Sequence, residues 1–257
     1  MEFVFGQYKP WALAIIGLLV SAEIAWSIIE DKQVYKVKET LANLGIILGF
    51  IVTKALFTSY QVAIMAFAYK FAIFDFPDKP WVYVLTFILV DFIYYWFHRL
   101  SHIWKPLWAF HVVHHSGQSM NLTTSYRLNW FSAVISPLFF VPLAFIGFSP
   151  QVIVLSFAFN LLYQFILHTE VVGKLGKLEG VIDTPSAHRV HHGSNKIYID
   201  KNFGGVLMCW DRLFKTYQAE TEKPVYGTTE GFVSYNPIKL VFHGFIDLFK
   251  GKMKYKG

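Results

Sequence analysis

The sequence predicts an all-α fold class: an integral membrane helical bundle of about four to five spans, completed by a cytosolic helical cap. Three observations lead to this prediction. Hydrophobic residues make up 54% of the chain and charged residues only 16%, which is typical of membrane proteins. Apolar runs long enough to cross a bilayer recur along the chain. Nine of the ten histidines lie between residues 98 and 192, close to the ends of these runs.

The first two apolar runs differ in length. Residues 11–29 are apolar apart from Glu23 and have the length of one span. Residues 41–74 include Lys54 and are too long for one straight helix across ~30 Å of hydrocarbon at ~1.5 Å per residue. We therefore expect the second segment to tilt, bend or protrude from the bilayer. Glu23 and Lys54 are expected to pair with each other.

Three further apolar runs complete the predicted bundle. Residues 80–97 form a third span, and residues 131–148 and 151–167 form a fourth and a fifth. The last two runs are separated only by a short connection that includes Gly147 and Pro150, which predicts a tight helical hairpin. The hairpin returns the chain to the side of the membrane on which it entered.

The histidines form three spaced clusters, with His168 alone between the second and the third. The clusters read His98-Arg-Leu-Ser-His102, His111-Val-Val-His114-His115 and His188-Arg-Val-His191-His192. Residues three and four apart share one face of a helix, so each cluster directs two or three imidazoles the same way. Neutral imidazole is a good ligand for iron and zinc. One metal cannot use eight or nine imidazoles, so the pattern predicts a histidine-rich site for two metals.

Short helices are expected to present these clusters. The third span should continue past the bilayer as far as His102, and Pro106 suits the first turn of the next helix. Thr184 and Pro185 predict a helix start, with threonine as the cap and proline in the first helical position. The third cluster follows within the first two turns of that helix.

All three clusters are expected on one side of the membrane, because the hairpin brings the chain back to the side that holds the first cluster. The same side carries many basic residues: Arg99, Lys105, Arg127, Lys174, Lys177, Arg189, Lys196 and Lys201. Basic residues accumulate in cytoplasmic loops of membrane proteins. We therefore expect a multi-pass protein with its metal site on the cytoplasmic face.

The net charge of +6 does not indicate a nucleic-acid partner here, because the basic residues gather beside apolar spans. The single cysteine, Cys209, excludes an internal disulfide, and its position outside the histidine clusters makes a metal-binding role unexpected.

Four residues are candidates to support the imidazoles by hydrogen bonding: Asp91, Glu170, Asn195 and Asp200. Asp91 lies seven residues before His98, and an acidic residue within a span is usually functional. It could instead satisfy a polar group between spans, and Glu170 could be merely interfacial. Tyr94, Tyr95 and Trp96 could line a substrate tunnel or could be ordinary interfacial aromatics.

The chain is expected to form a single domain over residues 1–257. About residues 1–80 supply N-terminal spans, residues 81–217 the histidine-cluster catalytic core, and residues 218–257 an amphipathic C-terminal tail. Within that tail, residues 237–256 mix apolar side chains with five lysines, which is typical of a helix on an anionic membrane surface. His243 is expected there as a surface residue and not as a ligand.

Several stretches resemble the fatty acid hydroxylase / sterol desaturase superfamily of integral membrane di-iron enzymes. They include Asp91-Phe-Ile-Tyr-Tyr-Trp-Phe-His-Arg99, His188-Arg-Val-His-His-Gly193, Tyr198-Ile-Asp-Lys-Asn-Phe-Gly-Gly-Val-Leu207 and Pro224-Val-Tyr-Gly227. The likeness covers roughly residues 88–245. Within the superfamily, the second half of the chain is most similar to the alkylglycerol monooxygenase branch.

This resemblance implies that the eight clustered histidines hold two iron ions, with His168 as a ninth ligand. It implies an O2-dependent monooxygenase that hydroxylates an alkyl C–H bond of a lipid, which in that branch is the carbon next to the ether oxygen of an alkylglycerol. Zinc would be an inactive substitute, because it has no redox chemistry. With no redox domain apparent in the sequence, electrons are expected from a separate donor, either tetrahydrobiopterin or a redox protein.

The substrate and reductant stay open, because the chain departs from that branch at Ile103, where the branch has an acidic residue, and at Ala187, where it has a histidine. A sterol or fatty acyl desaturase or hydroxylase is the alternative within the superfamily. A histidine-rich metal transporter is the alternative from another class, although transporter sites lie near the bilayer midplane. A zinc protease would need His-Glu-x-x-His, which the first cluster lacks.

Overall fold

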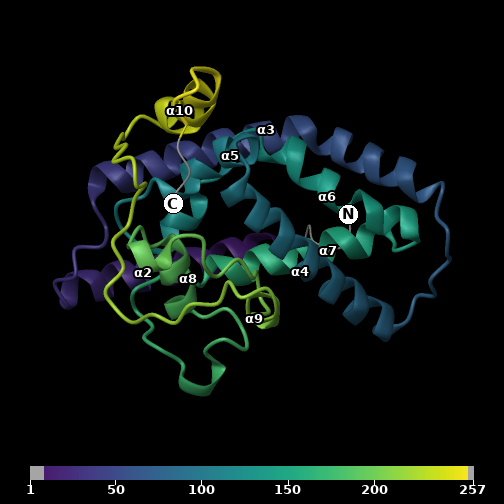
Figure 1. Cartoon of the computed structure of the whole chain (residues 1–257), viewed down its shortest axis with the longest axis horizontal. Helices are drawn as coiled ribbons and strands as arrows, with labels where there is room; N and C mark the ends of the chain where they lie inside the picture. The colour runs from purple at the N-terminus through teal and green to yellow at the C-terminus, as the bar shows by residue number, and fades with distance from the viewer. Residues whose placement is uncertain (1–8, 254–257) are drawn as a thin grey trace.

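The computed structural model describes residues 9–253, and within these residues every regular element is a helix, accompanied only by isolated β-bridges (Figure 1). The all-α expectation is therefore confirmed. The α-helices are α2 (Lys9–Ile29), α3 (Val37–Tyr69), α4 (Pro80–Ile103), α5 (Lys105–His115), α6 (Ser132–Ile146), α7 (Pro150–Phe165), α8 (Pro185–His192), α9 (Cys209–Leu213) and α10 (Pro237–Phe249). Three short 3-10 helices lie between them: η1 (Leu122–Tyr126), η2 (Gly176–Leu178) and η3 (Lys196–Tyr198).

Three of the described helices are long and apolar enough to cross a membrane: residues Trp11–Ile29 of α2, α3 and α4. The second apolar run forms one continuous helix of 33 residues, α3, which is about 50 Å long and exceeds the hydrocarbon thickness. The runs expected as the fourth and fifth spans form helices α6 and α7, of 15 and 16 residues. At ~1.5 Å per residue these two helices are shorter than the ~30 Å hydrocarbon core.

Helices α6 and α7 form the expected hairpin. Gly147 ends α6 with φ +127°, a conformation that side chains rarely adopt, and a Cβ there would collide with the backbone of Phe74. The hairpin also packs against α4 through a shared apolar core that includes Val90, Phe140 and Ile153. This core fixes the hairpin beside the helix that carries the first histidine cluster.

Glu23 is buried on α2 and ties three distant segments together. It accepts hydrogen bonds from the Tyr35 hydroxyl at 2.5 Å, the Leu122 amide at 2.8 Å and the Thr169 hydroxyl. Lys54 is exposed on α3. The expected Glu23–Lys54 pair is therefore wrong, because the carboxylate is used by donors from the segments that flank the histidine site.

Asp91 is a fully buried carboxylate on α4 that holds the segment after η3. It accepts hydrogen bonds from the amides of Val206 at 2.9 Å and Leu207 at 3.2 Å, the Trp210 indole at 2.9 Å and the Asn160 side chain at 2.7 Å. The Asn160 donor is buried and the other three donors are partly buried, so losing this acceptor would cost free energy. Asp91 thus fastens the segment at residues 206–210 to α4 and α7.

The tail helix α10 packs against α5 and α3 and lies on the outer side of α3 in Figure 1. Its buried face includes Leu240, Val241 and Gly244, and a Cβ at Gly244 would meet the backbone of Ala109 on α5. His243 belongs to the same face, only 7% exposed and stacked on Phe232 at 3.9 Å between ring centroids. The expectation of a surface histidine is wrong, because α10 buries one face against α5 and α3.

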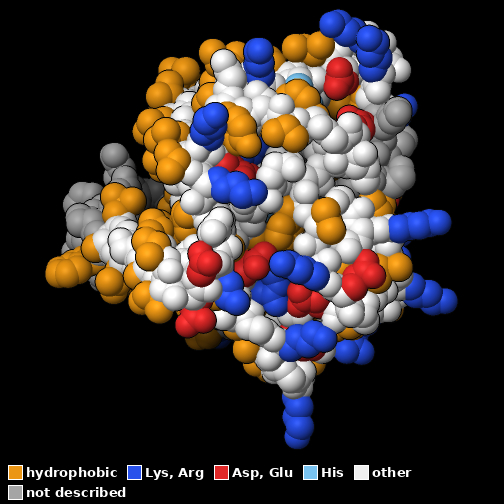
Figure 2. Space-filling view, turned by 90° about the vertical axis from the view of Figure 1, so that its left-hand side faces the viewer, with side chains coloured by type: hydrophobic (Ala, Val, Ile, Leu, Met, Phe, Trp, Pro, Cys, Tyr) orange, Lys and Arg blue, Asp and Glu red, His pale blue; other side chains and the backbone are white. Residues whose placement is uncertain are grey.

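The end of the molecule that carries the α2–α3 connection shows an uneven surface. In Figure 2, basic and acidic side chains gather over the lower half of this face, and hydrophobic side chains dominate its upper left. The hydrophobic helices and the charged loop region therefore divide this face between them.

We expect Asp91→Ala to lower the free energy of unfolding by about 3 kcal/mol or more, because one buried and three partly buried donors lose their acceptor and each unsatisfied buried donor costs about 1–3 kcal/mol. Thermal unfolding in detergent micelles measures the loss. Asp78→Ala is the matched control, because its carboxylate is exposed and accepts only from the Tyr83 hydroxyl. Equal stability of the two variants would contradict the anchoring role of Asp91.

Candidate metal centre

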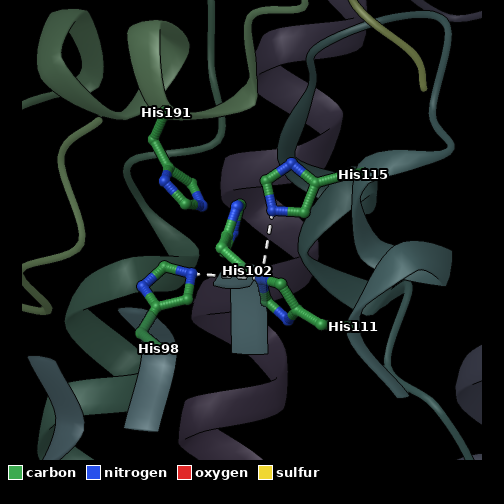
Figure 3. Close-up of side chains that lie close together, drawn as sticks. All are labelled: His98, His102, His111, His115 and His191. Atoms are coloured by element: carbon green, nitrogen blue, oxygen red, sulfur yellow. Dashed lines mark hydrogen bonds between the residues drawn. The ribbon is translucent and has the colours of Figure 1, made fainter. Parts of the chain in front are cut away.

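The structure brings all nine predicted histidines into two groups whose potential ligand nitrogens lie within 4.8 Å of one another inside each group. The larger group contains five histidines, and Figure 3 shows their rings directed toward a common centre. Its members are His98, His102, His111, His115 and His191. The smaller group consists of His114, His168, His188 and His192.

Each group combines side chains from different helices. The last turns of α4 supply His98 and His102, α5 and α8 contribute to both groups, and His168 follows the end of α7. Helix α8 begins as predicted, with the Thr184 hydroxyl accepting from the Ala187 amide at 3.1 Å and Pro185 in the first turn. Local helix rules therefore aim the clusters, and the packing of α4, α5 and α8 makes them converge.

The two groups lie side by side. The rings of His115 and His192, one from each group, stack with centroids 4.5 Å apart and planes 25° apart. His111 and His114, which also belong to different groups, have ring centroids 5.3 Å apart. The arrangement offers adjoining places for two ions and not one enlarged site.

Backbone carbonyls determine the tautomer of three of these histidines. The Nδ1 atoms lie 2.8–3.0 Å from carbonyl oxygens: His98 from Phe203, His168 from Gln164 and His191 from Lys201. A carbonyl oxygen only accepts, so each Nδ1 must carry the proton and each Nε2 keeps its lone pair. That is the form of imidazole that binds a metal.

The Nε2 atoms approach one another closely. His98 and His111 are 3.1 Å apart at these atoms, and His168 and His188 are 3.0 Å apart. Two nitrogens bound to one metal at ~2.1 Å, with a right angle between the bonds, are separated by about 3 Å. The donor set and its spacing therefore fit a metal in each group.

Two of the imidazoles have a carboxyl group near their Nδ1 atom. Asp183 Oδ2 lies 3.1 Å from Nδ1 of His188, and Asp200 Oδ1 lies 3.5 Å from Nδ1 of His102. A carboxyl oxygen at hydrogen-bond distance, as Asp183 is from His188, orients a liganding ring. Asp183 was missed by the sequence analysis, although an acidic residue directly before the Thr184 cap lies close to the first turn of α8.

The other three predicted supporting residues contact protein groups other than imidazoles. Asp91 holds the segment at residues 206–210, as described above. Glu170 lines a surface pocket with Lys174 and Glu220. Asn195 donates to the Glu222 carboxylate at 2.6 Å and accepts from the Val225 amide at 2.7 Å, and so fastens the segment at residues 222–225. Asp200 is thus the member of the predicted set that the structure places against a histidine.

The aromatic residues before His98 brace the helices. Tyr94 is buried, and its hydroxyl donates to Gln164 at 2.7 Å; the backbone carbonyl of Gln164 is the acceptor for His168. Tyr95 is fully buried, with its hydroxyl 3.1 Å from that of Thr216. These contacts give both tyrosines a bracing role, and the tunnel-lining alternative stays a prediction.

Burial keeps two of the imidazoles neutral. It lowers the pKa of His168 to about 4 and the pKa of His114 well below its usual value, with neighbouring histidines adding to the second shift. Burial also raises the pKa of Asp183 well above its ordinary range. His114 and His168 therefore present uncharged nitrogen ligands at neutral pH.

Arg127 secures the C-terminal end of α5, where the second cluster lies. This buried guanidinium donates to the Val113 carbonyl at 3.0 Å, the Ser116 hydroxyl at 2.6 Å and the Asn43 side chain at 2.7 Å. A basic side chain at a helix C-terminus satisfies carbonyls that have no partner within the helix. Arg127 is among the basic residues expected on the cytoplasmic side, and the structure buries its side chain inside the protein.

Access to the centre is uneven. Seven of the nine histidines are buried, whereas His111 and His114 are partly exposed. Both belong to α5 and lie one turn apart. The open side of both groups is therefore the same side of this helix.

Several known proteins are similar to this chain in sequence. Human alkylglycerol monooxygenase is 39% identical over 228 residues, which cover 88% of this chain and 51% of the human protein. Alkylglycerol monooxygenase of Xenopus tropicalis is 46% identical over 163 residues, or 63% of this chain and 36% of that protein. Ornithine lipid hydroxylase of Rhizobium tropici is 26% identical over 212 residues, or 80% of this chain and 63% of that protein.

The matched region covers about half the length of the human relative and less than half of the Xenopus relative. No solved structure matches it significantly. The sequence pattern of the fatty acid hydroxylase family matches residues 83–216, which include all nine histidines of the two groups and more than half of the chain. The chain belongs to the fatty acid hydroxylase family.

Proposed function

We propose that this chain is a membrane-bound di-iron monooxygenase that uses O2 to hydroxylate an alkyl C–H bond of a lipid. The single observation that carries the proposal is the convergence of nine imidazoles into adjoining groups of five and four. The family match over residues 83–216 supports it, and the relatives named as monooxygenase and lipid hydroxylase indicate the reaction type.

Iron is the proposed metal in both groups. Hydroxylating an unactivated C–H bond needs an oxidant stronger than any side chain, and iron supplies O2 activation when bound. Zinc accepts the same ligands but has no redox chemistry. In the overall reaction one oxygen atom enters the C–OH group and the other leaves as water, with two electrons and two protons from an external reductant. Tetrahydrobiopterin or a redox protein is the proposed donor.

The residues of the chain hold and orient the reacting groups. His98, His168 and His191 are fixed by their carbonyl acceptors, and His188 by Asp183. Burial of most ligands excludes bulk water from the site, which protects an oxidising centre from side reactions. His111 and His114 are the two partly exposed histidines, so the proposed approach of a substrate carbon to the metals passes these residues.

The ether-adjacent carbon of an alkylglycerol is the proposed target, because alkylglycerol monooxygenases of several animals are 36–46% identical to this chain. Hydroxylation at that carbon gives a hemiacetal, which breaks down to a fatty aldehyde and glycerol. A lipid of this kind suits an integral membrane protein whose site lies at the ends of long apolar helices.

The proposed domain organisation is a single domain with its catalytic core at residues 81–217, which the family match at residues 83–216 supports. We also place the metal site on the cytoplasmic face. The support for this placement is the set of exposed lysines in the loops beside the site, including Lys174, Lys177 and Lys196.

We expect the protein to bind two iron ions per chain after anaerobic loading, as measured by inductively coupled plasma mass spectrometry. Replacing His98 and His102 together by alanine should remove the metal of the larger group. Replacing His168 and His188 together should remove the other, so each variant should retain one ion. His243→Ala is the control and should retain two. Unchanged metal content in both double variants would refute the assignment.

Asp183→Asn should weaken metal binding by the smaller group about 10- to 100-fold, because an amide replaces the carboxyl group that positions the His188 ring through its Nδ1 atom. Competition with a chromogenic chelator measures the affinity of each group. Glu222→Gln, which changes an exposed carboxylate near the same loops, should leave both affinities unaltered. An equal loss of metal affinity in both groups would indicate general destabilisation and would contradict a specific role of Asp183 at His188.

The iron-loaded protein should convert hexadecylglycerol to hexadecanal and glycerol in the presence of O2 and a reductant. Gas chromatography with mass spectrometry measures the aldehyde. Sterols and fatty acids are tested as alternative substrates, and tetrahydrobiopterin and redox proteins are compared as electron donors. The zinc-loaded protein should give no product. A desaturated product, or no product from a fully iron-loaded protein with any lipid and donor, would overturn the proposed reaction.

A further inference from the structure

An apolar groove lies between α5, α6 and α10, with a volume of about 380 Å³. Its size falls within the range of about 300–1,000 Å³ that small-molecule sites occupy. It is lined by Phe110, Phe131, Val134, Ile135, Phe242, Phe245 and Phe249. The groove is distinct from the histidine groups and has no part in the site described so far.

Aromatic rings form most of the wall. Phe110 on α5 meets Phe245 on α10 edge to face, with ring centroids 4.8 Å apart. Phe131, at the start of α6, lies 5.8 Å from Phe242 between ring centroids. The lining residues carry no polar side chain, so a peptide or a polar head group would lose hydrogen bonds on entering. A hydrocarbon chain is the occupant that this lining suits.

The groove adjoins the open side of the metal centre. Phe110 directly precedes His111 and lies one turn before His114, on the same side of α5 as that residue. These two histidines are the partly exposed members of the nine. An alkyl chain that lies along Phe110 therefore leads toward these two histidines, one from each group.

Helix α6 makes a second connection between the groove and the centre. Phe139 lies one turn beyond Ile135 and contacts Phe97 on α4, with ring centroids 4.8 Å apart. Phe97 in turn precedes His98, whose Nε2 atom lies 3.1 Å from that of His111. The apolar wall thus continues from the groove to residues beside the larger histidine group.

The outer end of the groove is open. Phe249, the last residue of α10, is 87% exposed, and Ile246 one turn earlier is 46% exposed. Exposed apolar side chains on an amphipathic helix suit the hydrocarbon of a bilayer. A chain that is too long for the groove can therefore leave past α10 into the membrane.

We propose that this groove binds the alkyl tail of the lipid substrate, with the carbon to be hydroxylated at the inner end beside His111 and His114 and the tail running outward past Phe249. The assignment rests on the proposed function for the identity of the substrate. The groove would then set the preference for chain length, since each buried methylene is worth about fourfold in affinity.

The test compares Val134→Trp, which fills the groove, with Val62→Trp, the same replacement at an exposed position of α3. Val134→Trp should raise KM for hexadecylglycerol about tenfold or more relative to Val62→Trp, and should raise KM for octylglycerol much less. Both variants should retain two metals. An equal rise for both chain lengths, or none, would overturn the groove assignment.

A second measurement does not depend on turnover. Metal-free protein in nanodiscs is photolabelled with a hexadecylglycerol analogue that carries a diazirine on its tail, and labelled peptides are identified by mass spectrometry. Labelling should fall on the groove residues of α5, α6 and α10 and should be reduced in Val134→Trp but not in Val62→Trp. An excess of unlabelled hexadecylglycerol should reduce the labelling of the groove. The same excess of phosphatidylcholine should reduce it only weakly.

The outcomes separate the two proposals. Groove labelling in a protein that converts no lipid would support the groove and refute the proposed reaction. Turnover together with photolabelling outside the groove would refute the groove as the site of the alkyl tail, but would still support the proposed reaction. Equal competition by phosphatidylcholine would show a site for bulk lipid, and a crosslink between two chains across the groove would show a dimer contact; either result would overturn the assignment to substrate.

Discussion

Hydrogen bonds from imidazole Nδ1 atoms to backbone carbonyls are the constraint on which the metal centre depends. They hold the protons of His98, His168 and His191 on the outer side of each ring, so that the Nε2 lone pairs face inward. Without these acceptors a ring could turn or change tautomer and present a proton instead of a lone pair. The positions of the carbonyls, and not the histidines alone, therefore determine whether the groups can bind a cation.

The positions of those carbonyls depend in turn on buried carboxylates. Asp91 fastens the segment at residues 206–210, and Asp211 accepts from the Phe203 amide at 2.8 Å and the Gly204 amide at 2.7 Å. Phe203 is the residue whose carbonyl holds His98. Glu23 binds the hydroxyl of Thr169, directly after His168. Polar groups that cannot be left unpaired inside the protein thus link the apolar helices to the histidine loops.

Much of this arrangement follows from local sequence rules. Apolar runs predicted the helices, and spacings of three and four residues predicted which imidazoles share a face. The start of α8 was predictable because Thr184 and Pro185 satisfy the requirements of a helix N-terminus. The lengths of α6 and α7 were less predictable, since apolar composition continues past the residues at which each helix ends.

By itself the sequence determined the helical class, the nine histidines and the faces on which they lie, because these depend on residues within one or two turns of each other. The tertiary structure decided the division into groups of five and four, the partners of Glu23 and the burial of His243. It also decided the acceptor of each Nδ1 proton; His98 and the carbonyl of Phe203 are 105 residues apart. Contacts at such separations depend on how whole helices pack, and no local periodicity specifies them.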